Sequence, residues 1–312
     1  MTTLPAAIVD THHHLWCLSD GHYPWLQEDY APQRFILGEY RDLCRDYLPA
    51  QLRQDVGALP VVGSVHVEAE RERGQALAET AWVLRQSDAL GWPLAVVAWV
   101  DLLADDVETQ LDRQLAWPEV RGVRFKPVVS SSASVRLQDT PGCLADPRWT
   151  RGLTALAARG LLWEMRTPYW HLEEAAALIA QVPGLKVVVQ HTGLPWDRSE
   201  AGLQSWARGL RSLAALPEVH LKLSELGLRD RAWTLDDNLP VVRTAIDCFG
   251  AKRCLFGSNF PVARLRINYS ALVQAMSTCL AHLTAAEQRA IWHDNAVALY
   301  RLAVASHPGV SQ

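Results

Sequence analysis

Apolar residues recur along this chain in two alternating patterns. Short runs rich in Val, Ile and Leu predict strands, and longer segments of helical character follow them. The strands are expected at about 7–14, 60–69, 93–101, 120–128, 161–168, 185–193, 220–226 and 253–261. Helices are expected at, among others, 75–89, 105–116, 147–159, 172–181, 199–216, 239–249 and 284–303. Strands that alternate with helices indicate βαβ units and a parallel sheet.

Eight such units, with no break in composition and no linker, predict an α/β protein: a single (β/α)8 TIM barrel over residues 1–312. A doubly wound open sheet is the alternative, but no G-x-G-x-x-G follows the first strand, so a dinucleotide site is unsupported. The connections 17–59 and 129–146, after strands one and four, are unusually long. They lie on the side where barrels build active sites, so they are candidate lids; surface insertions are the alternative.

The composition is that of a globular protein with a large core, since 49% of the residues are hydrophobic and 21% are charged. A net charge of −4 gives no electrostatic case for nucleic acid or an anionic membrane as a partner. We expect neither secretion nor a membrane span, because no signal-like segment precedes Ile8 and no run of about 18 apolar residues occurs. Six scattered cysteines without C-x-x-C favour a cytoplasmic protein with reduced thiols.

The strongest chemical signal lies in Ile8-Val9-Asp10-Thr11-His12-His13-His14. Strand alternation predicts that His12 and His14 lie on one face, where two neutral imidazoles can converge on one metal ion. A strand-end histidine cluster without an ion is the alternative. His191, at the end of the sixth strand, would complete a three-imidazole set that zinc accepts while it leaves a position for water. Its alternative role is a hydrogen bond to a backbone carbonyl.

Seven of the eight predicted strands end in polar groups, which is typical of catalytic sites at the C-terminal ends of barrel strands. Besides the histidines above, these groups are His66, Glu68, Glu70, Arg124, Lys126, Glu164, Arg166, Lys222, Ser224 and Asn259. The three strand-end cations of strands four and five predict an anionic or oxygen-rich substrate, because the arginine fork fits a carboxylate. A compatible alternative is that they pair with the glutamates and neutralise the barrel mouth. Trp25 and Trp196 are candidates for an apolar wall against the substrate, with loop anchoring as the alternative.

These motifs resemble those of the amidohydrolase superfamily, in particular the amidohydrolase-2 branch of lactonases. The resemblance covers nearly the whole chain and lies in Val9-Asp10-Thr11-His12-His13-His14-Leu15-Trp16, Val65-His66-Val67-Glu68-Ala69, Arg121-Gly122-Val123-Arg124, Gln190-His191-Thr192-Gly193-Leu194-Pro195, Leu221-Lys222-Leu223-Ser224, Phe256-Gly257-Ser258-Asn259-Phe260-Pro261 and Asn295-Ala296-Val297-Ala298-Leu299-Tyr300. It includes lactonases of the fuconolactonase type and hydrolases of pyrone dicarboxylates, and it implies a TIM barrel.

The resemblance also implies roles for individual residues. His12, His14 and His191 would be the ligands of a divalent metal, with zinc as the first expectation. A metal-free site is the alternative, because some lactonases of this branch are thought to work without metal. Arg124 would bind the substrate carboxylate or hydroxyls, and we count Lys126, Arg166, His66, Trp25 and Trp196 with it as candidate substrate-binding residues.

One position departs from the pattern of the family. The superfamily normally has an aspartate at the end of strand eight, as metal ligand and as the base for the attacking water, and this chain has Asn259. An amide oxygen can orient water or ligate weakly, but an amide accepts no proton at neutral pH. Either Glu68 or Glu164 then serves as the base, or a metal activates water without a separate base. Otherwise the chain does something other than hydrolysis.

The sequence therefore predicts a hydrolase that opens a small lactone, either a sugar-acid lactone or one that carries a carboxylate. His191, Asn259, Glu164 and Glu68 are the candidate catalytic residues. A decarboxylase or hydratase on the same scaffold, or a catalytically silent small-molecule binder, is the alternative that Asn259 keeps open. The expected partner is a small anionic or polyhydroxylated molecule, and homo-oligomerisation is left open.

Overall fold

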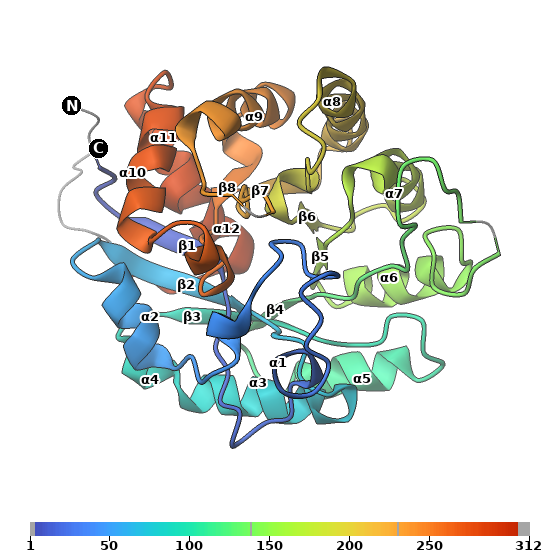
Figure 1. The fold of residues 1–312 in the computed structure, drawn as a ribbon. Helices are drawn as coiled ribbons and strands as arrows, with labels where there is room; N and C mark the ends of the chain where they lie inside the picture. The colour runs from blue at the N-terminus through green and yellow to red at the C-terminus, as the bar shows by residue number, and fades with distance from the viewer. Residues whose placement is uncertain (1–3, 138, 230, 305–312) are drawn as a thin grey trace.

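Eight parallel strands form one sheet with the order β1-β2-β3-β4-β5-β6-β7-β8 in the computed structural model, which describes residues 4–137, 139–229 and 231–304. The strands are Ile8–His13 (β1), Val61–Val67 (β2), Leu94–Ala98 (β3), Val120–Val123 (β4), Leu162–Met165 (β5), Val187–Val189 (β6), Val219–Leu223 (β7) and Cys254–Phe256 (β8). All seven pairings between neighbours are parallel. The predicted α/β barrel is confirmed (Figure 1).

Helices alternate with these strands and surround the sheet (Figure 1). They are Pro24–Gln27 (α1), Pro49–Val56 (α2), Ala76–Arg85 (α3), Ser87–Leu90 (α4), Val107–Gln114 (α5), Arg148–Ala158 (α6), Leu172–Ile179 (α7), Glu200–Ala214 (α8), Leu235–Phe249 (α9), Tyr269–Leu280 (α10), Ala285–Arg289 (α11) and Asn295–Tyr300 (α12). The expected helix 75–89 is divided into α3 and α4, and the long connection 17–59 contains α1 and α2. No helix in the described part of the chain is long and apolar enough to cross a bilayer.

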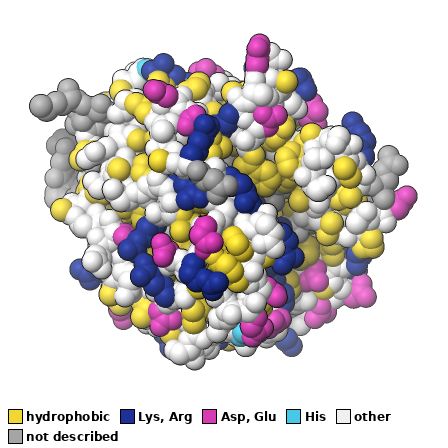
Figure 2. Space-filling view, viewed as in Figure 1, with side chains coloured by type: hydrophobic (Ala, Val, Ile, Leu, Met, Phe, Trp, Pro, Cys, Tyr) yellow, Lys and Arg dark blue, Asp and Glu magenta, His cyan; other side chains and the backbone are white. Residues whose placement is uncertain are grey.

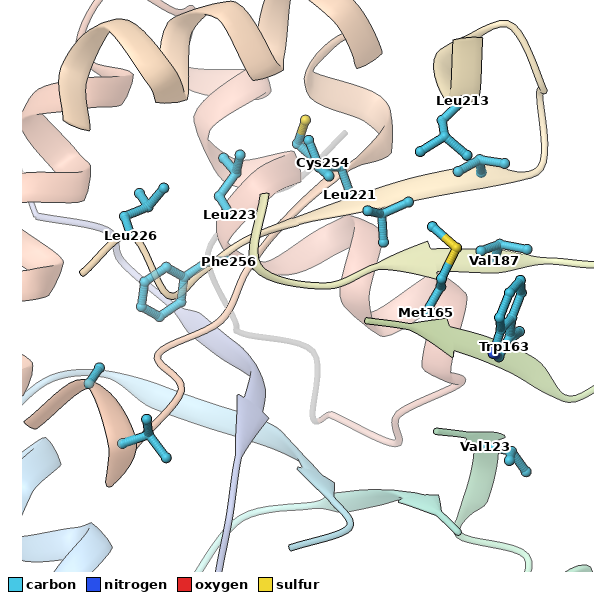
Figure 3. Close-up of a cluster of buried hydrophobic side chains, with 14 of the residues drawn as sticks. Val123, Trp163, Met165, Val187, Leu213, Leu221, Leu223, Leu226, Cys254 and Phe256 are labelled. Atoms are coloured by element: carbon cyan, nitrogen blue, oxygen red, sulfur yellow. The ribbon is translucent and has the colours of Figure 1, made fainter. Parts of the chain in front are cut away.

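Two apolar layers hold the barrel together. The larger one packs the outer face of the strands against the helices; Figure 3 shows Trp163, Met165 and Phe256 there, with Leu213 of α8. The smaller one fills the barrel interior with alternate strand residues and is closed by helix α12. It contains Val9, Val65, Val67, Ala95, Val97, Leu162, Val188, Leu255, Ala296, Tyr300 and Leu302. The two-residue period of the strands separates these layers.

Strands β8 and β1 meet through short contacts around the carboxylate of Asp10. Asp10 is 2% exposed, and its Oδ1 accepts hydrogen bonds from the amides of Ser258 (2.8 Å) and His12 (3.1 Å). Its Oδ2 accepts from the hydroxyls of Ser258 (2.6 Å) and Tyr269 (3.0 Å). Two backbone bonds complete the seam: the amide of His14 donates to Phe260 and the amide of Asn259 donates to His12. A fully buried acceptor therefore joins the first strand, the eighth strand and helix α10.

An extra residue in β1 changes the direction of its side chains. Asp10 pairs with Ser64, and the next pair joins His13 to His66, so β1 advances three residues where β2 advances two. Such a bulge interrupts the regular alternation of a strand. This allows Asp10 to bind the seam, whereas His12 and His14 lie against each other with ring centroids 5.0 Å apart.

We predict that Asp10→Ala lowers the free energy of unfolding by about 3 kcal/mol or more, because buried donors of Ser258, His12 and Tyr269 lose their acceptor. Tyr269→Phe removes one donor and leaves the acceptor satisfied, so it should cost about 1 kcal/mol. Urea unfolding followed by circular dichroism measures both values. Equal effects of the two substitutions would contradict the role of Asp10 in closing the seam.

Candidate active site

A pocket of about 430 Å³ opens at the C-terminal ends of the strands. Strand-end residues form its floor and one wall: His14, Ala69, Glu70, Arg124, Lys126, Arg166, His191, Asn259 and Val262. The connection between β1 and β2 forms the opposite wall with Trp25, Asp29, Ala31, Arg34, Phe35, Ile36 and Tyr40. Of the two long connections, the one at 17–59 thus lines the pocket, and no described residue of 129–146 does so. Whether either acts as a lid stays a prediction.

Three histidines from two strand ends lie close together: His14 and His191 line the pocket, and His12 is buried beside them. The ring of His12 lies 5.0 Å from that of His14 and 4.5 Å from that of His191, measured between centroids. His14 Nδ1 lies 2.7 Å from the carbonyl of Val67, and His191 Nδ1 lies 3.0 Å from the hydroxyl of Ser224. These contacts fix both rings through Nδ1, and neither Nε2 has a hydrogen bond to another described residue. His12 is fully buried, and neither of its ring nitrogens has a hydrogen-bond partner among the described residues.

The surroundings of these rings keep them uncharged. Burial lowers the pKa of His14 to about 3, and Arg124 adds to this effect. Burial likewise lowers the pKa of His12 and of His191 well below the ordinary value. Neighbouring positive groups lower the pKa of both rings further. Neutral imidazoles keep a lone pair for a metal or for a donor.

The donor chemistry of this set fits a divalent metal ion. Three neutral imidazoles are typical zinc ligands, and a buried histidine with two unpartnered nitrogens requires some partner. Within the described residues, however, no group of three or more His, Cys, Asp or Glu side chains is placed so that it could hold a metal ion. The assignment of His12, His14 and His191 as ligands is therefore a proposal.

Two of the expected substrate-binding cations are held by glutamates. Arg124 Nε donates to Glu68 Oε1 at 2.6 Å, and its Nη2 donates to the carbonyl of the same residue. Lys126 forms an ion pair with Glu70 at the rim of the pocket. Burial alone raises the pKa of Glu68, but the charges of Arg124 and Arg73 outweigh it and hold the pKa below the usual range. Glu68 therefore fixes Arg124 beside the pocket and is a poor base.

Two other arginines of the pocket have no such partner. Arg166, at the end of β5, and Arg34, in the connection 17–59, line the pocket with no side-chain hydrogen bond or ion pair to any described residue. Burial lowers the pKa of Arg166 and the charge of Glu70 opposes this, but a guanidinium stays protonated in either case. Figure 2 shows Lys and Arg side chains gathered near the middle of the face seen in Figure 1, with acidic side chains among them. The pocket thus offers free guanidinium groups to an anion.

Glu164, expected as a catalytic residue, lies below the pocket in the barrel interior. It is fully buried, 2.8 Å from Lys222 Nζ, and it also accepts hydrogen bonds from Gln190 Nε2 (2.9 Å) and the hydroxyl of Tyr300. Lys222 is itself fully buried and bound to this carboxylate. The group forms a polar layer between the apolar interior and the histidines. Glu164 does not line the pocket, so the structure gives it a role in holding the barrel rather than a place at the reacting atoms.

Asn259 does line the pocket, and its side chain contacts the carboxylate of Glu225. Its Nδ2 donates to Glu225 Oε2, while its Oδ1 has no partner among the described residues. Glu225 follows the end of β7 and is 8% exposed. Burial raises the pKa of Glu225 to about 7, against smaller opposing effects of Asn259 and the nearby amide of Gly227. This carboxylate was not among the predicted site residues, because nothing in the sequence indicated that it would contact Asn259.

The strand ends around the pocket adopt an unusual backbone conformation. Positive φ angles occur at Glu70 (59°), His191 (56°), Thr192 (55°), Glu225 (43°) and Asn259 (56°). Each of these non-glycine residues lies within three residues of the end of a strand. Left-handed conformations of such residues are strained and tend to cluster at functional sites. The strain therefore supports the assignment of this end of the barrel as the site.

Two expected substrate-binding residues lie elsewhere. His66 is fully buried beside His13, with ring centroids 5.8 Å apart, and 4.0 Å from Glu79. It alternates with Val65 and Val67, which fill the barrel interior, so it points away from the pocket. Trp196 is 37% exposed and packs edge-on against Trp170 outside the pocket. The structure thus keeps Trp25 as the aromatic wall, because its indole donates to the carbonyl of Ala69 at 2.9 Å.

Comparisons with known proteins agree with this geometry. A model of a family described as amidohydrolase matches residues 9–302. The chain is 31% identical over 296 residues to an uncharacterised protein, y4mH, of Sinorhizobium fredii, which covers 95% of this chain and 99% of that protein. It is 29% identical over 307 residues to an L-fucono-1,5-lactonase of Burkholderia multivorans, which covers 94% and 96% respectively.

A solved structure is similar over the same span. The crystal structure of an amidohydrolase from Burkholderia multivorans with bound zinc matches with a TM-score of 0.76 and 29% identity. The match covers 95% of this chain and 100% of that chain. The similarity thus extends over nearly the whole barrel.

We predict that Glu68→Ala lowers the free energy of unfolding by about 3–5 kcal/mol, because it leaves the buried guanidinium of Arg124 without its counter-charge. Arg73→Ala is the matched control: Arg73 also contacts Glu68, at 3.1 Å, but it is 41% exposed, so its loss should cost less than about 1 kcal/mol. Since the folded pKa of Glu68 is depressed, the stabilisation is present above the ordinary carboxyl pKa and is lost on acidification below it. Urea unfolding at neutral and acidic pH measures both; equal losses would contradict the assignment.

Proposed function

The chain belongs to the amidohydrolase family and is a hydrolase of it, and on that premise we propose that it opens a small lactone that carries a carboxylate group. One observation carries the proposal: the pocket that His14 and His191 line also contains the guanidinium groups of Arg166 and Arg34, which have no side-chain partner among the described residues. A lactone carbonyl would lie at the histidines while its carboxylate binds the guanidinium groups. The L-fucono-1,5-lactonase relative supports lactone chemistry, and the pocket supports the anionic substrate.

A divalent metal would be held by His12, His14 and His191. When bound, such an ion lowers the pKa of a water molecule and polarises a carbonyl group. The zinc in the Burkholderia multivorans structure supports zinc as the first candidate. The bonds from His14 to Val67 and from His191 to Ser224 keep both Nε2 atoms directed at the site, and this is how outer contacts of metal ligands usually act.

The other residues would bind the substrate and move protons. Arg166 is suited to a bidentate contact with the substrate carboxylate, because its guanidinium has no other partner among the described residues. Asn259 Oδ1 can accept a hydrogen bond from the attacking water. Ring opening releases an alkoxide that needs a proton, and Lys126 at the pocket rim can donate it, since burial lowers the pKa of Lys126 to about 8. Trp25 and Phe35 provide an apolar wall.

The first experiment is a screen of small lactones, with acid release followed by a pH indicator. The panel pairs carboxylated lactones with their methyl esters and with neutral sugar-acid lactones. We expect the carboxylated compounds to have the highest kcat/KM. A preference for neutral lactones would contradict the anionic substrate, and carbon dioxide release or water addition without acid release would contradict hydrolysis.

We predict that Arg166→Met lowers kcat/KM for a carboxylated lactone by about 10- to 100-fold, which corresponds to the loss of one charge-assisted contact. The same variant should change kcat/KM for the methyl ester of that lactone by less than about 3-fold, because no charge is lost there. Arg34→Met removes the second guanidinium group, which is exposed to solvent, and should therefore have a smaller effect of the same kind. Steady-state kinetics on the two substrates measures both effects. Equal losses of kcat/KM for the acid and the ester would contradict a contact between Arg166 and the substrate carboxylate.

We further predict that protein purified without chelator binds about one equivalent of a divalent metal and that His12→Ala loses it. His13→Ala is the matched control, because the neighbouring ring of His13 contacts the Ser64 hydroxyl at 3.0 Å and does not join the three-histidine set. Elemental analysis of the folded variants measures the content. Wild-type protein without metal, and without uptake on addition, would contradict the ligand assignment.

A further inference from the structure

We propose that Glu225 is a positioning residue for Asn259: it fixes the side-chain amide so that Oδ1, and not Nδ2, faces the pocket and orients the attacking water. The inference rests on the proposed hydrolysis. It concerns a contact between the ends of β7 and β8. Asn259 is buried, with 3% of its surface exposed, and its amide oxygen has no hydrogen-bond partner among the described residues.

The chemistry of the two groups determines the orientation. An asparagine amide has a donor side and an acceptor side, and it can turn either one toward the pocket. The carboxylate form of Glu225 can only accept, so in that form it binds Nδ2 and repels Oδ1. Asn259 lines the pocket and its Nδ2 donates to Glu225 Oε2, so Oδ1 is the side-chain atom that is left for a partner from the pocket. Glu225 thereby selects one of two otherwise similar side-chain orientations.

The backbone holds both residues where this selection works. Asn259 N–H donates to the carbonyl of His12 at 2.7 Å, which ties the amide to the strand that carries the first histidines. Both Glu225 and Asn259 have positive φ angles, so neither side chain follows the direction of its strand. A Cβ at Gly227 would lie only 2.9 Å from Glu225 Oε1, so this glycine leaves the room that the carboxylate occupies.

The orientation matters because of the lone pairs of water. A water molecule that donates to Oδ1 keeps its lone pairs free for attack on the lactone carbonyl. The reversed amide would instead donate through Nδ2 and occupy a lone pair. Correct orientation of a nucleophile and its hydrogen bonds contributes strongly to enzymatic rates. Glu225 would therefore affect kcat without touching the substrate.

The test uses substitutions at both positions. Glu225→Met removes the acceptor at similar side-chain length and should lower kcat by about 10²-fold with KM little changed, because Nδ2 turns toward the pocket. Glu225→Gln still offers an acceptor and should lose only several-fold. In Asn259→Asp the new carboxylate presents an acceptor whichever way it turns, and the amide introduced by Glu225→Gln can donate to it. The double variant Glu225→Gln/Asn259→Asp should therefore reach within about 10-fold of wild type.

The single variant Asn259→Asp places two carboxylates in contact and should be less active than the double variant. A merely structural role of Glu225 predicts no such rescue. Wild-type kcat in Glu225→Met, or a folded double variant no more active than Asn259→Asp, would overturn the proposal. If the wild type opens no lactone at all, it is the proposed function that fails.

In that event a second measurement still tests the contact. In wild-type protein labelled with [¹⁵N]Asn, the side-chain amide protons of Asn259 should exchange slowly with solvent, because Nδ2 is bound to Glu225. The signal is assigned by its absence in Asn259→Asp. In Glu225→Met the exchange should be at least about 10-fold faster, since the amide then turns toward the pocket. Equal exchange in the two proteins would overturn the proposal.

Discussion

A buried carboxylate needs donors or a counter-charge, and the architecture of this barrel depends on how that requirement is met. Asp10 receives four hydrogen bonds at the seam, Glu164 binds Lys222 in the interior, and Glu68 binds Arg124 beside the pocket. Each group joins elements that are distant in sequence: β1 to β8, β5 to β7 and β2 to β4. The polar contacts therefore determine which strand ends come together, and the apolar layers supply the bulk of the packing.

Several groups at the C-terminal ends of the strands are left without partners among the described residues. His12 has two unpartnered nitrogens, Asn259 has an unpartnered oxygen, and Arg166 has no ion pair among the described residues. Glu225 is bound by a neutral side-chain amide rather than by a cation, and burial raises its pKa. Unsatisfied buried groups are rare in folded proteins, so each of these calls for a ligand, a substrate or water. Others lie away from the pocket, at His66 and Arg198 for example, so it is the position at the strand ends that links these groups to the site.

The amide at the end of strand eight changes how the site has to be understood. The side chain of Asn259 is uncharged, and it donates a hydrogen bond to the carboxylate of Glu225. The two positions together retain an unpartnered amide oxygen on a residue that lines the pocket and a carboxylate in contact with that residue. The carboxylates that were first expected to act as bases, Glu68 and Glu164, are instead bound to cations. The site of this chain is thus arranged around a polar pair from two adjacent strands.

The sequence by itself determined the order of strands and helices and the three histidines, since strand periodicity and strand-end position are local properties. It also identified Arg124, Lys126 and Arg166, because the carboxyl ends of parallel strands share one edge. Only the tertiary structure decided which of these cations is free, because the two ion pairs of Arg124 and Lys126 each join residues 56 positions apart. The direction of His66 and the contact of Glu225 with Asn259 were likewise beyond the sequence. Side-chain partners across strands follow from register, twist and bulges, which local composition does not encode.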